Sequence, residues 1–452
     1  MALILPNSIF IHIPKTGGTW VRRAIEASMG LDKDSHDLPI DGVENWESTA
    51  HATFSDVKKQ LSNDIENKLT FAFVRNPLDI LKSAYIEEVW PELMDEETRV
   101  IKGRKKISFS DFVLTREEGH VSWFYRYYLK SHTGIFPSVD YIGRTENLKN
   151  DLIEALEIAG EEFDKEAIER IPPVRMGASL EVAKKVIKCS QQLEDSIMRD
   201  EQDTIDMFYS DNKYSNLQNV AYDNMASMWS IKNKNFVTGP FNRHNKWEDY
   251  NFLFSGMFDF HDGGTKLPLA KNMSVLDFGC GPGRNLEKYS SNFKRVDGVD
   301  ISHVNLDNAK KWLKHTGSCR DNNLFKTNGT DLREISDSQY DVVMSTITLQ
   351  HISVHEVRLN LFKEFYRVLV DSGWFTAQMG YGEGKLGAVP YYKNYYNSGS
   401  RNGRTDVYVE SPDQLKEDLY KVGFNSFDYE IRPTGPADKH PNWIFFRAKK
   451  VQ

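Results

Sequence analysis

Apolar and polar positions follow two different periods along the chain, and twice a short apolar run passes through glycines directly into a helical pattern. The first passage is "SIFIHIPKTGGTWVRRAIEASM" at residues 8–29, and the second is "SVLDFGCGPGRNLEKY" at residues 274–289. Each predicts a buried strand, a glycine loop and a helix, and Gly30 stands where a left-handed residue ends the first helix. Because such a passage is typical of the start of an α/β domain, the sequence predicts two α/β domains.

The boundary between the predicted domains falls in a polar stretch. Residues 209–224 are rich in Asn and Ser, which favours a junction near residue 215. A chain of 452 residues also exceeds what one core usually organises. We therefore predict domains at 1–215 and 216–452. Residues 216–270 contain too many aromatic side chains for a flexible linker and are assigned to the second domain as a helical lead-in or lid.

Composition and charge indicate a soluble protein and argue against membrane-spanning, nucleic-acid-binding and metal-binding classes. The chain is 40% hydrophobic and 27% charged, which is ordinary for soluble proteins, and no apolar run reaches the roughly 18 to 20 residues that cross a bilayer. The N-terminus lacks the pattern of a signal peptide, so we expect a cytoplasmic protein. A net charge of -8 argues against nucleic-acid binding. Cys189, Cys280 and Cys319 lack metal-ligand spacing, so we expect reduced thiols and no metal site.

The first glycine loop has a chemistry suited to an anion. It lies at the N-terminus of a predicted helix, where exposed N–H groups and the helix dipole attract phosphate or sulfate. Gly17 and Gly18 allow close approach of a ligand to the backbone, and Lys15 adds a full charge. Lys15 precedes both glycines, so the loop does not match the G-x-x-x-x-G-K-[ST] pattern of nucleotide hydrolases. A tight turn without a ligand would have the same spacing.

A second stretch, "LTFAFVRNPLDILKSAY" at residues 69–85, predicts another buried strand and a helix that begins at Pro77. Arg75 lies at the carboxyl end of the strand, and Ser83 lies in the second turn of the helix. Both positions face the crevice where open α/β folds bind ligands. An arginine fork and a hydroxyl suit a phosphate monoester. The alternative is that Arg75 pairs with a structural carboxylate.

Together these stretches resemble the sulfotransferases that use 3′-phosphoadenosine 5′-phosphosulfate, especially their membrane-carbohydrate and bacterial branch. "PKTGGTW" is similar to their 5′-phosphosulfate loop, "VRNPLDILKSAY" to their 3′-phosphate motif, and "VDYIGRTENLKNDL" to a later segment. The resemblance covers about residues 8–210 and implies a P-loop-like fold. It implies cofactor contacts from Lys15, Thr16, Gly17, Gly18, Thr19, Arg75 and Ser83. Ile80 departs from the pattern, because many relatives have a basic residue there.

Sulfuryl transfer needs a cation at the leaving oxygen and a base for the acceptor hydroxyl. Lys15 suits the first role. His51 occupies the place where related enzymes often have a histidine, and histidine accepts a proton near neutral pH. His12, His36 and Glu44 remain alternatives. His12 falls within the first predicted strand, which favours a structural histidine.

The second strand–loop–helix passage, residues 274–289, is followed by further predicted strands. "RVDGVDIS" places Asp300 at the end of a second strand, where an acidic residue suits ribose hydroxyls. "NGTDL" supplies Asp331, and "YDVVMSTITLQHI" predicts a fourth strand that is followed by an amphipathic helix and a fifth strand. A nicotinamide-binding domain would also place glycines after its first strand. Asp297 is expected to be a solvated turn residue.

This set resembles the class I methyltransferases that use S-adenosylmethionine, with their first motif at Asp277, Gly279, Gly281 and Gly283. The resemblance covers about residues 270–450 and implies a Rossmann-like fold with a seven-stranded sheet. It implies Asp277 near the methionine amine, Asp300 at the ribose and Asp331 near the adenine. His351, at the end of the fourth strand, is the candidate base, with His355 behind it, and a structural role for either remains open. Residues 388–408 suit sugar binding or an aromatic lid.

The sequence therefore predicts a bifunctional sulfotransferase and methyltransferase. Its partner would be a hydroxylated small-molecule acceptor, either a saccharide or a natural product, and the oligomeric state is not predicted. Two alternatives remain: one domain is inactive, or the chain binds both nucleotides without turnover.

Overall fold

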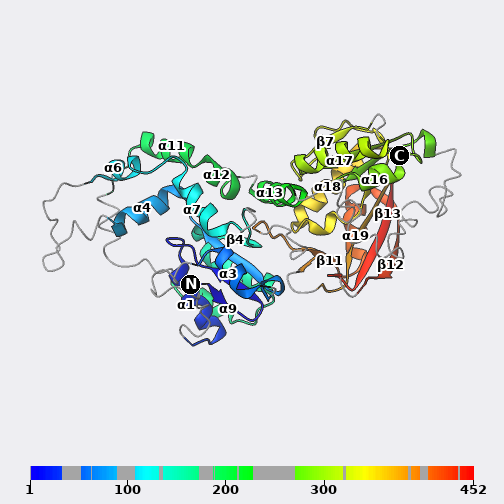
Figure 1. Ribbon diagram of the computed structural model, residues 1–452. Helices are drawn as coiled ribbons and strands as arrows, with labels where there is room; N and C mark the ends of the chain where they lie inside the picture. The colour runs from blue at the N-terminus through cyan, green and yellow to red at the C-terminus, as the bar shows by residue number, and fades with distance from the viewer. Residues whose placement is uncertain are drawn as a thin grey trace, which may run out of the picture. The chain divides into compact units, whose positions relative to one another are not determined.

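The computed structural model describes thirteen stretches of the chain: 2–32, 52–62, 64–88, 107–131, 136–172, 187, 189–210, 213–227, 270–318, 322–384, 388–397, 406–435 and 438–451. Contacts between Cα atoms divide the chain into two compact units, Met1–Asn216 and Leu217–Gln452, and each is described by itself (Figure 1). The predicted limits of 1–215 and 216–452 lie beside this division. That each part folds alone stays a prediction.

The polar stretch at the predicted junction contains a helix. Helix α13 covers Lys213–Ser227. In this helix the carbonyl oxygen of Ala226 accepts a hydrogen bond from Asn308 Nδ2 at 2.9 Å. The Asp223 carboxylate of the same helix accepts one from the Ser302 hydroxyl at 2.5 Å. Tertiary contacts therefore outweigh the low helical preference of the Asn and Ser residues. Residues 228–269 of the predicted lead-in lie outside the described residues.

The first unit is built on a sheet in the order β1-β2-β3-β4, in which β2, β3 and β4 are parallel and β1 is antiparallel to β2. The strands are β1 (Leu3–Ile4), β2 (Ser8–Ile11), β3 (Leu69–Val74) and β4 (Tyr141–Arg144). Every residue of β2 and β3 is buried, as expected for strands covered on both faces. The helices that follow are α1 (Gly18–Met29) after β2, α4 (Pro77–Glu88) after β3 and α8 (Leu148–Ala159) after β4. The three connecting loops therefore meet at the carboxyl edge of the sheet.

Shorter helices complete this unit. They are α3 (Phe54–Leu61), η1 (Asp64–Asn67), α6 (Phe109–Leu114), α7 (His120–Leu129), η2 (Thr145–Asn147), α9 (Lys165–Arg170), α11 (Gln191–Asp200) and α12 (Gln202–Phe208). The start of α7 is fixed by the Glu201 carboxylate, which accepts hydrogen bonds from the backbone N–H groups of Val121 and Ser122 at 2.7 and 2.8 Å. This contact sets the position of Tyr125, a buried residue of α7 that reaches the carboxyl edge of the sheet.

The second unit contains a nine-stranded sheet in the order β10-β11-β9-β8-β5-β6-β7, with β13 also on β9 and β12 on β13. The strands are β5 (Ser274–Phe278), β6 (Arg295–Asp300), β7 (Leu324–Lys326), β8 (Tyr340–Ser345), β9 (Leu369–Tyr381), β10 (Val389–Pro390), β11 (Val407–Val409), β12 (Phe424–Pro433) and β13 (Asn442–Lys450). Strand β13, red in Figure 1, runs antiparallel to β9 and β12. The implied count of seven strands is wrong, because the short strand β11 pairs with the end of β9 and the short strand β10 pairs with β11.

Helices cover both faces of this sheet. They are η4 (Ala270–Asn272), α16 (Arg284–Tyr289), α17 (His303–Thr316), η5 (Leu349–His351), α18 (His355–Val368) and α19 (Pro412–Val422). On one face Phe365 of α18 packs against Phe278 and Phe375, with ring centroids 4.9 Å apart in both pairs. The predicted α/β class is confirmed in both units. Among the described residues, no helix is long and apolar enough to cross a membrane.

Three expectations about single residues can be compared with the fold. Asp297 is not a solvated turn residue: it is buried in β6 and accepts hydrogen bonds from the Tyr340 hydroxyl and the Asn323 backbone N–H, both at 2.8 Å. His12 lies just beyond β2 rather than inside it, because the strand ends at Ile11. Cys280, like Cys189, is a free thiol, and Cys319 lies outside the described residues.

Candidate functional site

Three sequence motifs of the first unit meet at the carboxyl edge of its sheet. Arg75 Nη1, after β3, donates a hydrogen bond to the backbone oxygen of Lys15, after β2, at 3.3 Å. The Thr145 hydroxyl, after β4, lies 2.9 Å from the carbonyl oxygen of Thr16 and 3.0 Å from that of Val74. The fold therefore brings together the two predicted anion-binding motifs and the later "IGRTEN" segment.

The first loop adopts a conformation that depends on glycine. Lys15 and Gly17 have φ angles of 66° and 85°, and a Cβ atom at Gly18 would lie 1.9 Å from the His12 ring. Helix α1 begins without a side-chain cap, so the N–H groups of Gly18 and Thr19 stand at an uncapped helix N-terminus. The Thr16 hydroxyl instead braces the loop by donating to the carbonyl of Ile13 at 2.8 Å. This arrangement suits an anion at the N-terminus of α1.

Arg75 is fixed through its backbone. The Tyr125 hydroxyl donates to the Arg75 carbonyl and accepts from the Arg75 N–H, both at 2.7 Å. Burial raises the pKa of the Tyr125 phenol, which keeps the donating proton in place. The next N–H group, of Asn76, donates to the Glu146 carboxylate at 2.8 Å. Sequence reasoning missed Tyr125, because its role follows from the packing of α7 and from no local pattern.

Ser83 lies half-buried on α4, and its hydroxyl forms no hydrogen bond with another described residue. The candidate base His51 and its alternatives His36 and Glu44 lie outside the described residues. His12 is half-buried beside the glycine loop and stacks on Phe10 with ring centroids 5.9 Å apart. Among the four candidate bases, the structure therefore places only His12 next to Lys15.

In the second unit, Asp277 occupies the carboxyl end of β5. Its Oδ1 accepts a hydrogen bond from Asn285 Nδ2 at 3.5 Å, whereas Oδ2 is buried and has no hydrogen-bond partner among the described residues. Burial raises the pKa of the Asp277 carboxyl from 3.8 to about 7. A buried carboxylate oxygen without a donor is costly, so this atom suits a ligand that brings a positive charge or a donor.

The three predicted glycines of the second loop all have positive φ angles, at 74° for Gly279, 51° for Gly281 and 89° for Gly283. A Cβ atom at Gly279 would lie 2.3 Å from Thr348, which excludes other residues there. A Cβ atom at Gly281 would meet no atom within 4 Å, so this glycine faces open space. Gly281 is therefore the point where a ligand can approach the loop.

Asp300 connects this loop to the end of β6. Its Oδ2 accepts from the Gly281 N–H at 2.9 Å, and its Oδ1 accepts from the Ser302 N–H at 2.8 Å. Burial raises the pKa of the Asp300 carboxyl, and these hydrogen bonds oppose that effect. Asn305 Nδ2 also donates to Oδ1, at 3.3 Å, so Oδ2 is the oxygen that retains a lone pair for a ligand hydroxyl.

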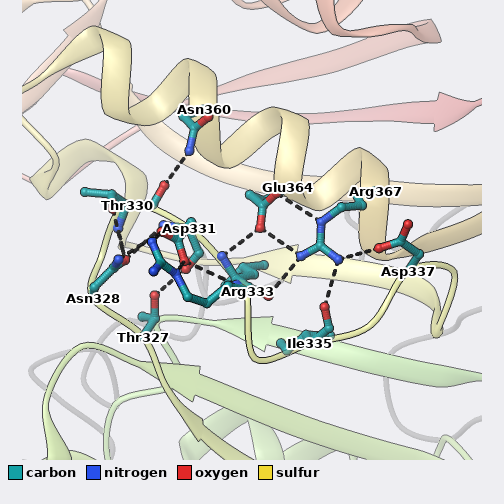
Figure 2. A network of polar contacts seen from close by, with 11 residues as sticks. Thr327, Asn328, Thr330, Asp331, Arg333, Ile335, Asp337, Asn360, Glu364 and Arg367 are labelled. Carbon is teal, nitrogen blue, oxygen red and sulfur yellow. Dashed lines mark hydrogen bonds and ion pairs between the residues drawn. The ribbon is translucent and has the colours of Figure 1, made fainter.

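Asp331 lies in a network of polar contacts rather than free at a strand end (Figure 2). Its carboxylate accepts from Arg333 Nε at 2.8 Å and from Arg333 Nη2 at 2.6 Å, and this pairing holds the pKa of Asp331 well below its usual range. The adjacent Leu332 N–H donates to Glu364 at 2.8 Å. A cavity of about 180 Å³ opens beside them, with apolar walls that include Val299 and Phe325. The contact between Asp331 and an adenine thus stays a prediction. In such a contact the Asp331 carboxylate would bind Arg333 and the adenine at the same time.

The two candidate histidines have different surroundings. His351 ends η5, and its Nδ1 lies 2.7 Å from Asp406 Oδ1. His355 Nε2 lies 2.7 Å from Asp418 Oδ2, which also accepts from the buried Tyr391 hydroxyl at 2.8 Å. His355 therefore ties the aromatic segment to α19, a structural contact. Residues 398–405 of that segment lie outside the described residues.

Comparisons with known proteins match each of the two predicted domains to a protein family. Residues 7–214 match the model of the sulfotransferase family, and residues 276–377 match that of a methyltransferase domain. Over 110 residues the chain is 30% identical to the biotin biosynthesis bifunctional protein BioHC of Teredinibacter turnerae. The aligned region is 23% of this chain and 19% of that protein. Over 225 residues it is 27% identical to the "Probable S-adenosylmethionine-dependent methyltransferase CRG1" of Saccharomyces cerevisiae, covering 48% of this chain and 72% of the relative.

Similar solved structures match part of the chain. A SAM-dependent methyltransferase from Methanosarcina mazei is 18% identical, covers 41% of this chain and 95% of its own, and has a TM-score of 0.33. A phosphoethanolamine N-methyltransferase 2 of Haemonchus contortus, solved with S-adenosyl-L-methionine, is 21% identical, covers 51% of this chain and 60% of its own, and has a TM-score of 0.34.

Proposed function

We propose that this chain, which joins a sulfotransferase-family domain to a methyltransferase domain as its sequence predicted, modifies hydroxylated acceptors with both groups. Both families are transferases. The proposed donors are 3′-phosphoadenosine 5′-phosphosulfate and S-adenosylmethionine, and the proposed acceptor is a saccharide or natural product. The observation that carries the proposal is the hydrogen bond from Arg75 to Lys15, because it joins two motifs that were each predicted to bind an anionic group.

The carboxyl edge of the first sheet fits a phosphosulfate donor. The uncapped start of α1 and the half-buried Lys15 offer donors and charge, and the Ser83 hydroxyl has no partner among the described residues. The proposed 5′-phosphosulfate contacts are Lys15, Thr16, Gly17, Gly18 and Thr19, and the proposed 3′-phosphate contacts are Arg75 and Ser83. When bound, the donor supplies the sulfuryl group. The Lys15 ammonium then stabilises the charge that develops on the leaving phosphate oxygen. We retain His51 as the proposed base.

The second unit fits S-adenosylmethionine, whose α-ammonium group matches Asp277 Oδ2, a buried oxygen to which no other described residue donates. The proposed contacts are Asp277, Gly279, Gly281, Gly283, Asp300 and Asp331. The open space at Gly281 and the remaining lone pair of Asp300 Oδ2 support this set. When bound, the cofactor supplies an activated methyl group. His351 would accept the proton that the acceptor hydroxyl releases.

Calorimetry with two product nucleotides tests the two sites separately on the full chain. Arg75→Ala should weaken 3′-phosphoadenosine 5′-phosphate by about 1.5 to 3 kcal/mol, the usual worth of a charged hydrogen bond, and leave S-adenosylhomocysteine unchanged. Asp300→Ala should do the reverse, so each variant is the control for the other. Unchanged affinity of Arg75→Ala for the first nucleotide would refute that site. Saturable binding of NAD in competition with S-adenosylhomocysteine would refute the second.

A further inference from the structure

A buried carboxylate lies between two imidazoles at the carboxyl edge of the second sheet. Asp406, just before β11, is 3% exposed. Its Oδ1 lies 2.7 Å from His351 Nδ1, and its Oδ2 lies 3.6 Å from His440 Nε2. The three residues come from distant parts of the sequence, so only the fold assembles them. Among the described residues, no cluster of His, Cys, Asp or Glu is arranged to hold a metal ion.

The contact with Asp406 determines which nitrogen of His351 carries a proton. An ionised carboxylate only accepts hydrogen bonds, so Nδ1 of His351 must be the donor, and the lone pair of the neutral ring lies on Nε2. Burial would raise the pKa of the Asp406 carboxyl, but the nearby imidazoles of His351 and His440 outweigh burial and hold that pKa well below its usual range. The carboxylate therefore stays ionised and keeps the ring in this tautomer.

The position of His440 is built into the sheet. A Cβ atom at Gly380 of β9 would lie 2.4 Å from the His440 ring, so the strand leaves room for the ring only because it has glycine there. The Thr434 hydroxyl donates to the His440 carbonyl at 2.5 Å, and the Trp443 ring packs 5.6 Å away. Neither ring nitrogen of His440 has a hydrogen-bond partner among the described residues. The fold thus holds a buried imidazole against the far oxygen of Asp406.

Exposure separates the three side chains. The His351 side chain is 19% exposed, whereas the side chains of Asp406 and His440 are 5% and 0% exposed. His351 is therefore the only member of the three that can meet a substrate, and the other two lie behind it. The order is that of a base, the group that orients it and a group that fixes the orienting group.

We infer that Asp406 and His440 are positioning residues for His351 in the proposed methyl transfer, and this inference rests on that proposed function. The acceptor oxygen forms a bond to the methyl carbon, the bond from that carbon to sulfur breaks with its electron pair left on sulfur, and the acceptor proton moves to His351 Nε2. The ring then carries a positive charge directly beside Asp406, which stabilises it.

The second histidine–aspartate pair of this unit provides a matched control. His355 and Asp418 have the same 2.7 Å separation, but Asp418 also binds the Tyr391 hydroxyl and joins α18 to α19. Asp418→Asn therefore removes an equivalent charge without touching the proposed base.

Nuclear magnetic resonance of the full chain with nitrogen-labelled histidine reports which ring nitrogen is protonated, with the His351 signal assigned by its loss in His351→Gln. In the wild type we expect the proton on Nδ1. In Asp406→Asn we expect it to move to Nε2, because the new amide can donate to Nδ1. Asp418→Asn should leave His351 unchanged, and His440→Gln should give a mixture of both tautomers. A wild-type ring protonated on Nε2, or an unchanged tautomer in Asp406→Asn, would overturn the inference.

Two further readings separate this inference from the proposed function. In calorimetry, S-adenosylhomocysteine should bind the wild type and Asp406→Asn with equal affinity. Absence of binding to the wild type would refute the methyltransferase proposal. The tautomer of His351 would still show whether Asp406 and His440 position that ring. The rate at which cell extract gains label from methyl-labelled S-adenosylmethionine should fall at least about 100-fold in Asp406→Asn, because general base catalysis contributes a factor of this size. In Asp418→Asn the same rate should fall less than about threefold. Equal losses in both variants would show a structural role only.

Discussion

Asp277→Asn tests the proposed cofactor site through stability. The carboxyl is buried, and its pKa rises from 3.8 to about 7 because of that burial. A raised pKa means that the folded state binds the proton more tightly than the unfolded state, so this contribution to stability is present below pH 3.8 and is lost as the pH rises through about 7. Above that pH the ionised group costs about 4 kcal/mol.

The isosteric amide of Asn removes this cost. Asp277→Asn should therefore increase the free energy of unfolding at pH 8 by up to about 4 kcal/mol, and by much less at pH 5. Urea unfolding at both pH values measures the difference. Asp297→Asn is the matched control, because Asp297 is equally buried but accepts from Tyr340 on one oxygen and from Asn323 on the other. The amide keeps only one accepting oxygen, so the loss of one of these bonds should destabilise the protein. If Asp277→Asn were less stable than the wild type at pH 8, the reasoning about the unpartnered oxygen would be wrong.

The same carboxyl should make cofactor binding depend on pH. At pH 6 most of the free protein carries a proton on Asp277, and an incoming ammonium group must displace it. The affinity for S-adenosylhomocysteine should fall about tenfold from pH 8 to pH 6, with close to one proton released on binding at pH 6. Calorimetry in buffers of different ionisation enthalpy measures both quantities. Asp277→Asn should bind more weakly at pH 8 and lose this dependence, whereas an affinity of the wild type that did not change with pH would refute the pairing.

Three further outcomes are expected. Lys15→Ala should abolish transfer of labelled sulfuryl groups and leave S-adenosylhomocysteine affinity unchanged in calorimetry; residual transfer near the wild-type rate would exclude its role. Gly18→Ala should lower the melting temperature and weaken 3′-phosphoadenosine 5′-phosphate, because its Cβ would clash with His12, whereas Gly30→Ala, with open space around it, should retain nucleotide affinity. Fragments 1–212 and 213–452, which keep α13 whole, should each fold and bind their own nucleotide; two insoluble fragments would contradict this.

Local patterns explain why much of the fold could be predicted. A buried strand, a glycine loop and a helix are adjacent in sequence, so their chemistry is visible without tertiary information. Gly30 ends α1 with a φ of 64° as predicted, and α4 begins at Pro77. The parallel order of β2, β3 and β4 then forces the predicted loops to one edge, which is why Arg75 and Lys15 meet.

The remainder depends on contacts between distant residues. Nothing local shows that Asp297 faces the Tyr340 hydroxyl or that Arg333 covers Asp331. The polar composition of α13 conceals a helix that packs against α17. Asp406 and His440 had no pattern at all, since a single acidic residue acquires meaning only from the imidazoles that the sheet brings to it.

Whether one chain transfers both groups is measured most directly by mass spectrometry of cell extract incubated with the purified full chain and two isotope-labelled donors. We expect compounds that gain the sulfuryl label and compounds that gain the methyl label. Lys15→Ala should remove only the first gain and Asp300→Ala only the second. Wild-type protein that transfers neither label, or only one of them, would contradict the proposed bifunctional enzyme.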